Sequence, residues 1–158
     1  MSEVSDGNST VSGLEILSTR TFDAPRERVF LAWTDPVHLA RWWGPKGFRN
    51  TFQEFELRSG GAWRFVMHGP DGVDYRNHSV FLEITEPERI VFDHMSGPHF
   101  RVIATFDEAG ATVGNTKLTY RMVFETAAAC AQVKTFALKA NEESFDRLAA
   151  ELKQMAAG

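Results

Sequence analysis

The residues of this sequence that could take part in chemistry are few, and four of them accompany apolar neighbours. His78 and His94 each share the face of a predicted strand with apolar side chains. A histidine that points into a core needs a hydrogen-bond partner or a ligand. With the Tyr120 hydroxyl and the Asn141 amide, the two histidines are candidate polar anchors of an internal cavity. In the alternative interpretation they bond to each other, to Tyr120 or to water.

Motifs for catalysis or metal binding do not stand out. The two histidines lie far apart in the sequence and lack a third ligand, which argues against a metal site. A single cysteine, Cys130, leaves no partner for an internal disulfide or a multi-cysteine metal site. The sequence has no paired carboxylates and no Ser-His-Asp order, and Gly69-Pro70-Asp71-Gly72 is typical of a turn rather than a phosphate loop. We therefore expect no catalytic residue, metal or cofactor, although an enzyme stays open as an alternative.

The composition suits a small soluble protein with more aromatic side chains than two packed layers would hide. Of the 158 residues, 43% are hydrophobic, and they include 13 Phe and 4 Trp. This surplus favours a cavity or a partner surface lined by aromatic rings. A net charge of −4 without a basic stripe argues against nucleic acid as a partner. No apolar run reaches the ~20 residues of a membrane span, and a lone cysteine fits a cytoplasmic location.

One domain, residues 14–157, is predicted to follow a disordered tail, residues 1–13. Alternating apolar and polar residues predict strands over 14–22, 51–57, 62–68, 74–85, 89–95, 100–106 and 116–124. Two short helices are predicted after the first strand, one starting at Asp23-Ala24-Pro25 and one at Asp35-Pro36. Short turns between consecutive strands indicate antiparallel pairing.

The last thirty residues predict one long helix. Residues 127–157 contain no Gly and no Pro. Apolar residues recur there at steps of three and four, which places them on one face together with Asn141. Strands grouped apart from helices indicate an α+β fold. We expect a curved antiparallel sheet of six to seven strands around this helix, with a cavity between the two.

This order of elements resembles the helix-grip fold of START (SRPBCC) domains, pollen allergens and polyketide cyclases. Several motifs are also similar to the activator of ninety-kilodalton heat-shock protein ATPase homologues. They are Arg20-Thr21-Phe22-Asp23-Ala24-Pro25, Arg41-Trp42-Trp43-Gly44-Pro45-Lys46-Gly47-Phe48, Gly60-Gly61, Gly69-Pro70-Asp71-Gly72, Phe81-Leu82-Glu83-Ile84, Pro87-Glu88-Arg89-Ile90-Val91-Phe92 and Phe145-Asp146-Arg147-Leu148. The resemblance covers about residues 14 to 156. It departs from the family at Ala140-Asn141, where members often carry Gly-Trp.

The resemblance implies a helix-grip domain that binds a hydrophobic ligand such as a lipid, or a co-chaperone with a role in the stress response. A cyclase or hydrolase using the same cavity is a further alternative. Because members of one fold carry many functions, the fold alone does not select among these.

The candidate ligand-binding residues are those expected at the cavity mouth or on the inner faces. They are Trp42, Trp43, Phe48, Trp63, Phe65, Met67, His78, Phe92, His94, Val102, Tyr120, Met122, Phe136, Asn141 and Phe145. In the alternative interpretation, the apolar residues of this set are ordinary core residues. The favoured function is binding of a small hydrophobic or amphipathic molecule without catalysis. A heat-shock chaperone is the alternative partner, and the protein is expected to be a monomer or a homodimer.

Overall fold

The computed structural model describes residues 9–11, 13–110 and 114–157. The elements follow in the order β1 (Ser9–Val11), β2 (Glu15–Phe22), α1 (Arg26–Thr34), α2 (Pro36–Trp42), β3 (Arg49–Phe55), β4 (Ala62–His68), β5 (Asp74–Thr85), β6 (Arg89–His94), β7 (Phe100–Glu108), β8 (Thr116–Phe124) and α3 (Ala127–Ala157). This is the predicted α+β order, with two short helices after the first long strand and one long helix at the end.

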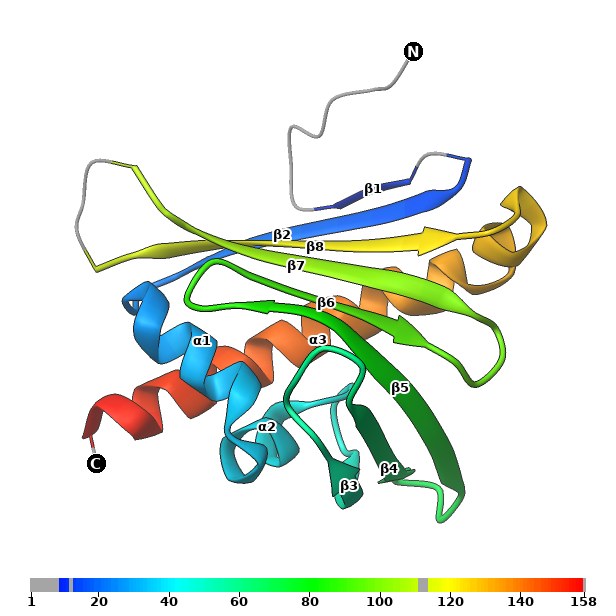
Figure 1. The fold of residues 1–158 in the computed structure, drawn as a ribbon, viewed down its shortest axis with the longest axis horizontal. Coiled ribbons are helices and arrows are strands. Elements are labelled where there is room, and N and C mark those ends of the chain that lie inside the picture. Colours follow the sequence, from blue (N-terminus) through cyan, green and yellow to red (C-terminus); the bar gives the residue numbers. More distant parts are fainter. Residues whose placement is uncertain (1–8, 12, 111–113, 158) are drawn as a thin grey trace.

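The strands form a single antiparallel sheet in the order β1-β2-β8-β7-β6-β5-β4-β3. Strands β3 to β8 pair in sequence order because tight turns join them, and β2 closes against β8. Figure 1 shows the sheet curving, with α3 crossing behind it and α1 and α2 beside the C-terminal half of α3. The predicted helix-grip architecture is confirmed.

The structure has one strand more than the sequence predicts. Ser9–Val11, assigned to a tail in the sequence, forms β1 and pairs with Ile16–Ser18 of β2. The polar composition of residues 1–13 gave no strand pattern, although three of these residues can pair with an edge strand. Residues 1–8 and 12 of the predicted tail lie outside the described residues.

The short helices begin and end where local chemistry dictates. Asp35 caps α2, its carboxylate accepting a hydrogen bond of 2.9 Å from the Val37 amide, and Pro36 occupies the first turn. Trp33 of α1 and Trp42 of α2 are buried against each other, with ring centroids 5.0 Å apart. The two short helices are thereby joined by a buried contact between aromatic side chains.

The two halves of helix α3 have different roles. Leu148 and Leu152 in the C-terminal half are buried, and this half contacts α1 and α2. The preceding turns, from Val133 to Phe145, face the sheet across an internal space. Because one amphipathic face runs along the whole helix, the same stripe of residues serves packing in one half and a cavity wall in the other.

Strand β5 is where the predicted facing of side chains is wrong. Alternation had turned His78 inward, on a strand face shared with apolar side chains. A bulge between Phe81 and Glu83 shifts the register against β6, so the inward residues before it are Asn77, Ser79 and Phe81. His78 instead sits opposite the exposed Arg64 of β4.

Candidate functional site

A cavity of about 250 Å³ lies between the sheet and the N-terminal half of α3. Its walls come from the α2 end and the segment after it, from strands β4 to β8, and from α3. The lining residues are Trp42, Trp43, Gly44, Pro45, Phe65, Met67, Asn77, Ser79, Phe92, His94, Pro98, Phe100, Tyr120, Met122, Val133, Phe136, Ala137, Ala140, Asn141, Ser144 and Phe145. Most of this surface is apolar, as is common for small-molecule pockets.

The structure brings most of the predicted ligand-binding residues to this one cavity. Those that line it are Trp42, Trp43, Phe65, Met67, Phe92, His94, Tyr120, Met122, Phe136, Asn141 and Phe145. Phe136 stands apart among them because 68% of it is exposed, which places it at the opening rather than in the interior. Whether these residues bind a ligand stays a prediction.

Four predicted residues lie away from the cavity wall. Trp63 and Val102 are fully buried, and Trp63 is stacked on Phe65 with ring centroids 4.5 Å apart. Phe48 packs against Tyr75 at a centroid distance of 5.9 Å. His78 was displaced by the β5 bulge. Alternation placed Trp63 and Val102 correctly on the inner face of the sheet. It does not distinguish residues that line the cavity from residues buried behind that lining.

Sequence reasoning missed several lining residues, many of which are small or polar. Asn77 and Ser79 take the inward positions on β5 that the bulge had concealed. Ala137 and Ala140 on α3 create space by being short. The signal for Ala137 was its position four residues before Asn141, and for Ala140 its position four residues after the predicted Phe136. Pro98 and Phe100 follow the β6–β7 turn, where strand facing is hardest to assign.

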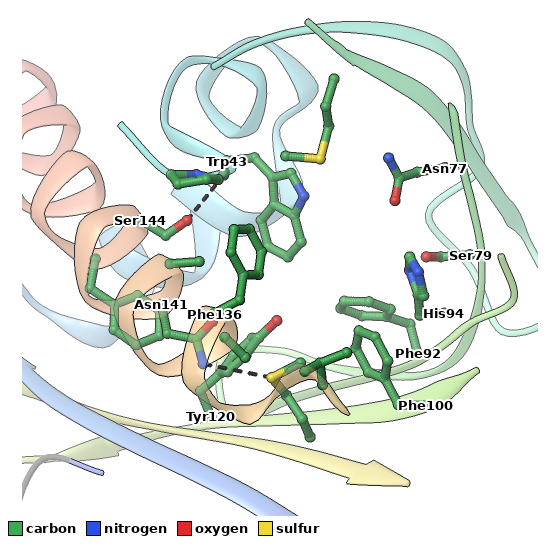
Figure 2. Close-up of a pocket in the computed structure, with 18 of the residues that line it drawn as sticks. Trp43, Asn77, Ser79, Phe92, His94, Phe100, Tyr120, Phe136, Asn141 and Ser144 are labelled. Atoms are coloured by element: carbon green, nitrogen blue, oxygen red, sulfur yellow. Dashed lines mark hydrogen bonds between the residues drawn. The ribbon is translucent and has the colours of Figure 1, made fainter. Parts of the chain in front are cut away.

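His94 and Tyr120 present polar atoms to the cavity without a partner. The His94 ring is stacked on Phe100, with centroids 4.5 Å apart and planes 20° from parallel. Burial, helped by the nearby His99, lowers the pKa of His94 to about 4, so the ring is neutral at pH 7. Burial also raises the pKa of Tyr120 well above its usual range. Within the described residues, neither side chain forms a hydrogen bond, and Figure 2 shows the Tyr120 hydroxyl pointing into the open space.

The amide of Asn141 and the hydroxyl of Ser144 face the cavity from α3, opposite Asn77, Ser79 and His94 (Figure 2). Asn141 Nδ2 donates to Ser18 Oγ at 3.2 Å and lies 3.6 Å from the Met122 sulfur. These contacts fix the amide against the sheet. The predicted role of Asn141 as a polar anchor is therefore shared with packing between α3 and β8.

The segment after α2 is fastened over one end of the cavity. The Gly44 amide donates to Ser144 Oγ at 3.0 Å, and Gly44 has a φ of +98°. This backbone conformation favours glycine, and a Cβ at Gly44 would also lie 2.6 Å from the terminal methyl of Met67, which would have to move. Arg147 donates to the carbonyls of Arg41, Trp43, Gly44, Pro45 and Phe48 at 2.9–3.2 Å. One turn of α3 thus holds the Trp43–Phe48 segment in place.

The comparisons agree with this geometry. The sequence profile of the family described as "Activator of Hsp90 ATPase homolog 1-like protein" matches residues 23–154. The chain belongs to this family. The match spans all elements from the start of α1 almost to the end of α3, so the cavity lies wholly within the AHSA1 domain.

Several solved structures share the AHSA1 fold of this chain. A solution structure of a protein from Arthrobacter aurescens is 24% identical with a TM-score of 0.83, covering 92% of this chain and 91% of that chain. A crystal structure from Chromobacterium violaceum is 26% identical with a TM-score of 0.75, covering 86% and 95%. The AHSA1 protein from Silicibacter pomeroyi is 19% identical with a TM-score of 0.74, covering 89% and 99%. Among curated proteins, none matches significantly.

Two further properties concern the described part of this AHSA1 domain. No helix there has both the length and the apolar character needed to cross a bilayer. No three side chains of His, Cys, Asp or Glu gather there in an arrangement that could hold a metal ion.

Proposed function

We propose that this AHSA1 domain binds a small hydrophobic or amphipathic molecule in the cavity between the sheet and α3. The observation that carries the proposal is the pairing of apolar walls with inward polar atoms that lack partners, chiefly those of His94 and Tyr120. Polar groups inside a protein are nearly always hydrogen-bonded to protein or to water, so these cavity-facing atoms need a partner from within the cavity. A ligand that carries a polar group would supply the missing partner.

The packing around the cavity supports the same conclusion. Protein interiors are close-packed, so an apolar cavity of about 250 Å³ forgoes packing contacts that a filled core would make. Larger side chains at Ala137 and Ala140 of α3 would fill the space without disturbing the sheet. The chain instead keeps short side chains at both positions and surrounds them with aromatic rings. A cavity maintained in this way is suited to an occupant.

Native mass spectrometry of the protein purified from its own host tests the proposal, followed by denaturation and identification of any small molecule released. Ala137→Leu is the matched loss-of-space variant, because Ala137 is buried and lines the cavity. Ala150→Leu is its control, since Ala150 is exposed on the same helix. We expect a co-purifying compound in the native protein and in Ala150→Leu, and its loss from Ala137→Leu.

Two results would count against binding in the cavity. A compound retained equally by Ala137→Leu would place the ligand elsewhere. An empty native protein that also fails to bind small aromatic probes would remove the proposal. In that case the role named by the family, activation of a heat-shock ATPase, becomes the function to test, and stimulation of the chaperone's ATP hydrolysis by this protein is the measurement. Turnover of a bound compound that is lost in His94→Phe would indicate an enzyme.

A further inference from the structure

The cavity contains no ionised side chain, which is a property distinct from its being largely apolar. None of the lining residues is Asp, Glu, Lys or Arg among the described part of the chain. The titratable groups on the wall are His94 and Tyr120 alone. Burial keeps the imidazole uncharged because it lowers the pKa of His94 to about 4, and it keeps the phenol protonated by raising the pKa of Tyr120.

The charges nearest to the wall are directed elsewhere. Glu142, next to Asn141, pairs with Arg20 at 2.8 Å, and Glu143 accepts from the Lys46 amide at 3.0 Å. Arg147 lies behind Gly44 and Pro45, and its terminal nitrogens donate to backbone carbonyls. Since these groups are already engaged, none is free to neutralise a charge that entered the cavity.

The polar groups that do face the space are neutral and sit on opposing walls. Ser79 and His94 lie on one side, and the Tyr120 hydroxyl points between them and α3 (Figure 2). Within the described residues, no hydrogen bond occupies the Ser79 hydroxyl, the His94 ring nitrogens or the Tyr120 hydroxyl. A hydroxyl can both donate and accept, and a neutral imidazole does each through a different nitrogen. This set can match a neutral hydroxyl or carbonyl in several orientations.

Energetics then separate neutral from charged ligands. A hydrogen bond to a neutral group contributes about 0.5–1.5 kcal/mol net. An ion transferred into such a site loses its hydration, at a penalty of several kcal/mol that only an opposite charge offsets. The described lining residues provide no such charge. The loss of affinity caused by a carboxylate or ammonium group should therefore be much larger than the gain of affinity from a hydroxyl group.

We propose that the cavity selects an uncharged, compact, ring-containing molecule that bears a hydroxyl or carbonyl group, and that it discriminates against carboxylates of the same shape. The selection of compact molecules follows from the volume of about 250 Å³, which lies just under the ~300–1,000 Å³ typical of small-molecule pockets. This inference rests on the proposed binding function and specifies the chemical class of its ligand.

Three probes that share one naphthalene ring system test the inference by calorimetric titration at pH 7 on the full chain. They are naphthalene, which is apolar, 2-naphthol, which adds a neutral hydroxyl, and 2-naphthoate, which carries a charge. We expect 2-naphthol to bind several-fold more tightly than naphthalene and at least about 100-fold more tightly than 2-naphthoate, as the loss of several kcal/mol implies.

Tyr120→Phe and Ser79→Ala are the variants that separate recognition from packing. Each removes a hydroxyl that has no partner within the described residues, so the fold should tolerate both. We expect one or both to weaken 2-naphthol several-fold, toward the affinity of naphthalene, while naphthalene itself is unchanged.

The outcomes distinguish the two levels of the argument. Binding of 2-naphthoate as tight as that of 2-naphthol would overturn the selection for neutral ligands and leave the cavity as a binding site. Equal affinities of 2-naphthol and naphthalene, unchanged in both variants, would overturn the role of the hydroxyl groups. No binding of any probe, with Ala137→Leu behaving like the native protein, would overturn the proposed function and this inference together.

Discussion

The buried surroundings of His94 determine its protonation state. Its ring is stacked flat on Phe100 in a wall without carboxylates, so desolvation lowers the pKa to about 4 and no ion pair opposes the shift. The unfolded chain should titrate near 6.5. Between these two values the unfolded state binds more protons than the folded state, and linkage makes stability decrease as the pH falls through that window.

We expect unfolding by urea to show this loss between pH 6.5 and pH 4. At about 1.36 kcal/mol per pKa unit, His94 accounts for at most about 3 kcal/mol. His94→Phe keeps the stack on Phe100 and removes the titration. The variant should therefore lose less stability than the native protein over the same interval. Parallel pH profiles for the two proteins would show that His94 is not the group responsible.

At this scale the sequence predicted most of the wall and little of its detail. Phe92, His94 and Tyr120 were assigned to the inner face because their strands alternate regularly, and the structure places them there. Ser79 and Ala137 were missed because polar and small residues in those positions look like surface or filler. A cavity is space that the side chains of several elements leave unfilled. This depends on how the elements pack together, which a local sequence pattern does not indicate.

Among the described elements, α3 supplies the most lining residues of the cavity. The sequence predicts a long helix within residues 127–157, because no Gly or Pro interrupts the helical period there, and α3 spans this whole stretch. The sequence did not indicate that Arg147 would fasten the segment after α2, since backbone carbonyls leave no trace in a residue pattern. Desolvation lowers the pKa of Arg147, in keeping with an environment of carbonyls rather than carboxylates.

Arg147→Lys should loosen the segment from Trp43 to Phe48. A lysine has three donors on a single nitrogen and cannot reach five carbonyls spread along the segment, so two or more would lose their hydrogen bond to this side chain. We expect a loss of about 1–3 kcal/mol in stability and faster amide exchange at Gly44 and Phe48. Arg58→Lys, at an exposed position in the turn before β4, serves as the control. Unchanged exchange in Arg147→Lys would contradict this account of the segment.

Strand β5 shows where prediction at the element scale failed. Its bounds, Asp74–Thr85, agree with the alternating pattern. The bulge after Phe81 breaks that alternation, so residues on its two sides cannot be assigned to faces by counting in twos. Regular alternation along the strand therefore turned His78 inward, whereas the paired register places it opposite Arg64.

Taken as a whole, the molecule has one continuous core that spans the sheet, the short helices and α3. Rings of α1, α2, β4 and β8 meet within it, and the cavity opens inside the same cluster rather than between separate units. A single cooperative unit is the expectation for such packing. The fold class and the order of elements were predictable from the sequence because they depend on periodicity and turns, which are local.

We expect thermal unfolding to follow one transition. Far-ultraviolet circular dichroism reports on α3 and the sheet, whereas tryptophan fluorescence reports on the region around α2. The two curves should coincide, and both midpoints should rise together when 2-naphthol is added in excess, because ligand binds only the folded state. An early fluorescence transition ahead of the loss of helix would indicate that the cavity region unfolds on its own.

The four tryptophans form an unbroken chain through this core. Trp33 lies 5.0 Å from Trp42, Trp42 lies 5.5 Å from Trp43, and Trp43 lies 5.0 Å from Trp63, measured between ring centroids. At such separations excitation energy passes from one indole to the next, so the emission of each ring depends on the surroundings of the others. Two of them stand in the cavity wall. A molecule that enters beside either ring therefore changes the light given out by all four, and the protein reports its own occupancy without an added dye.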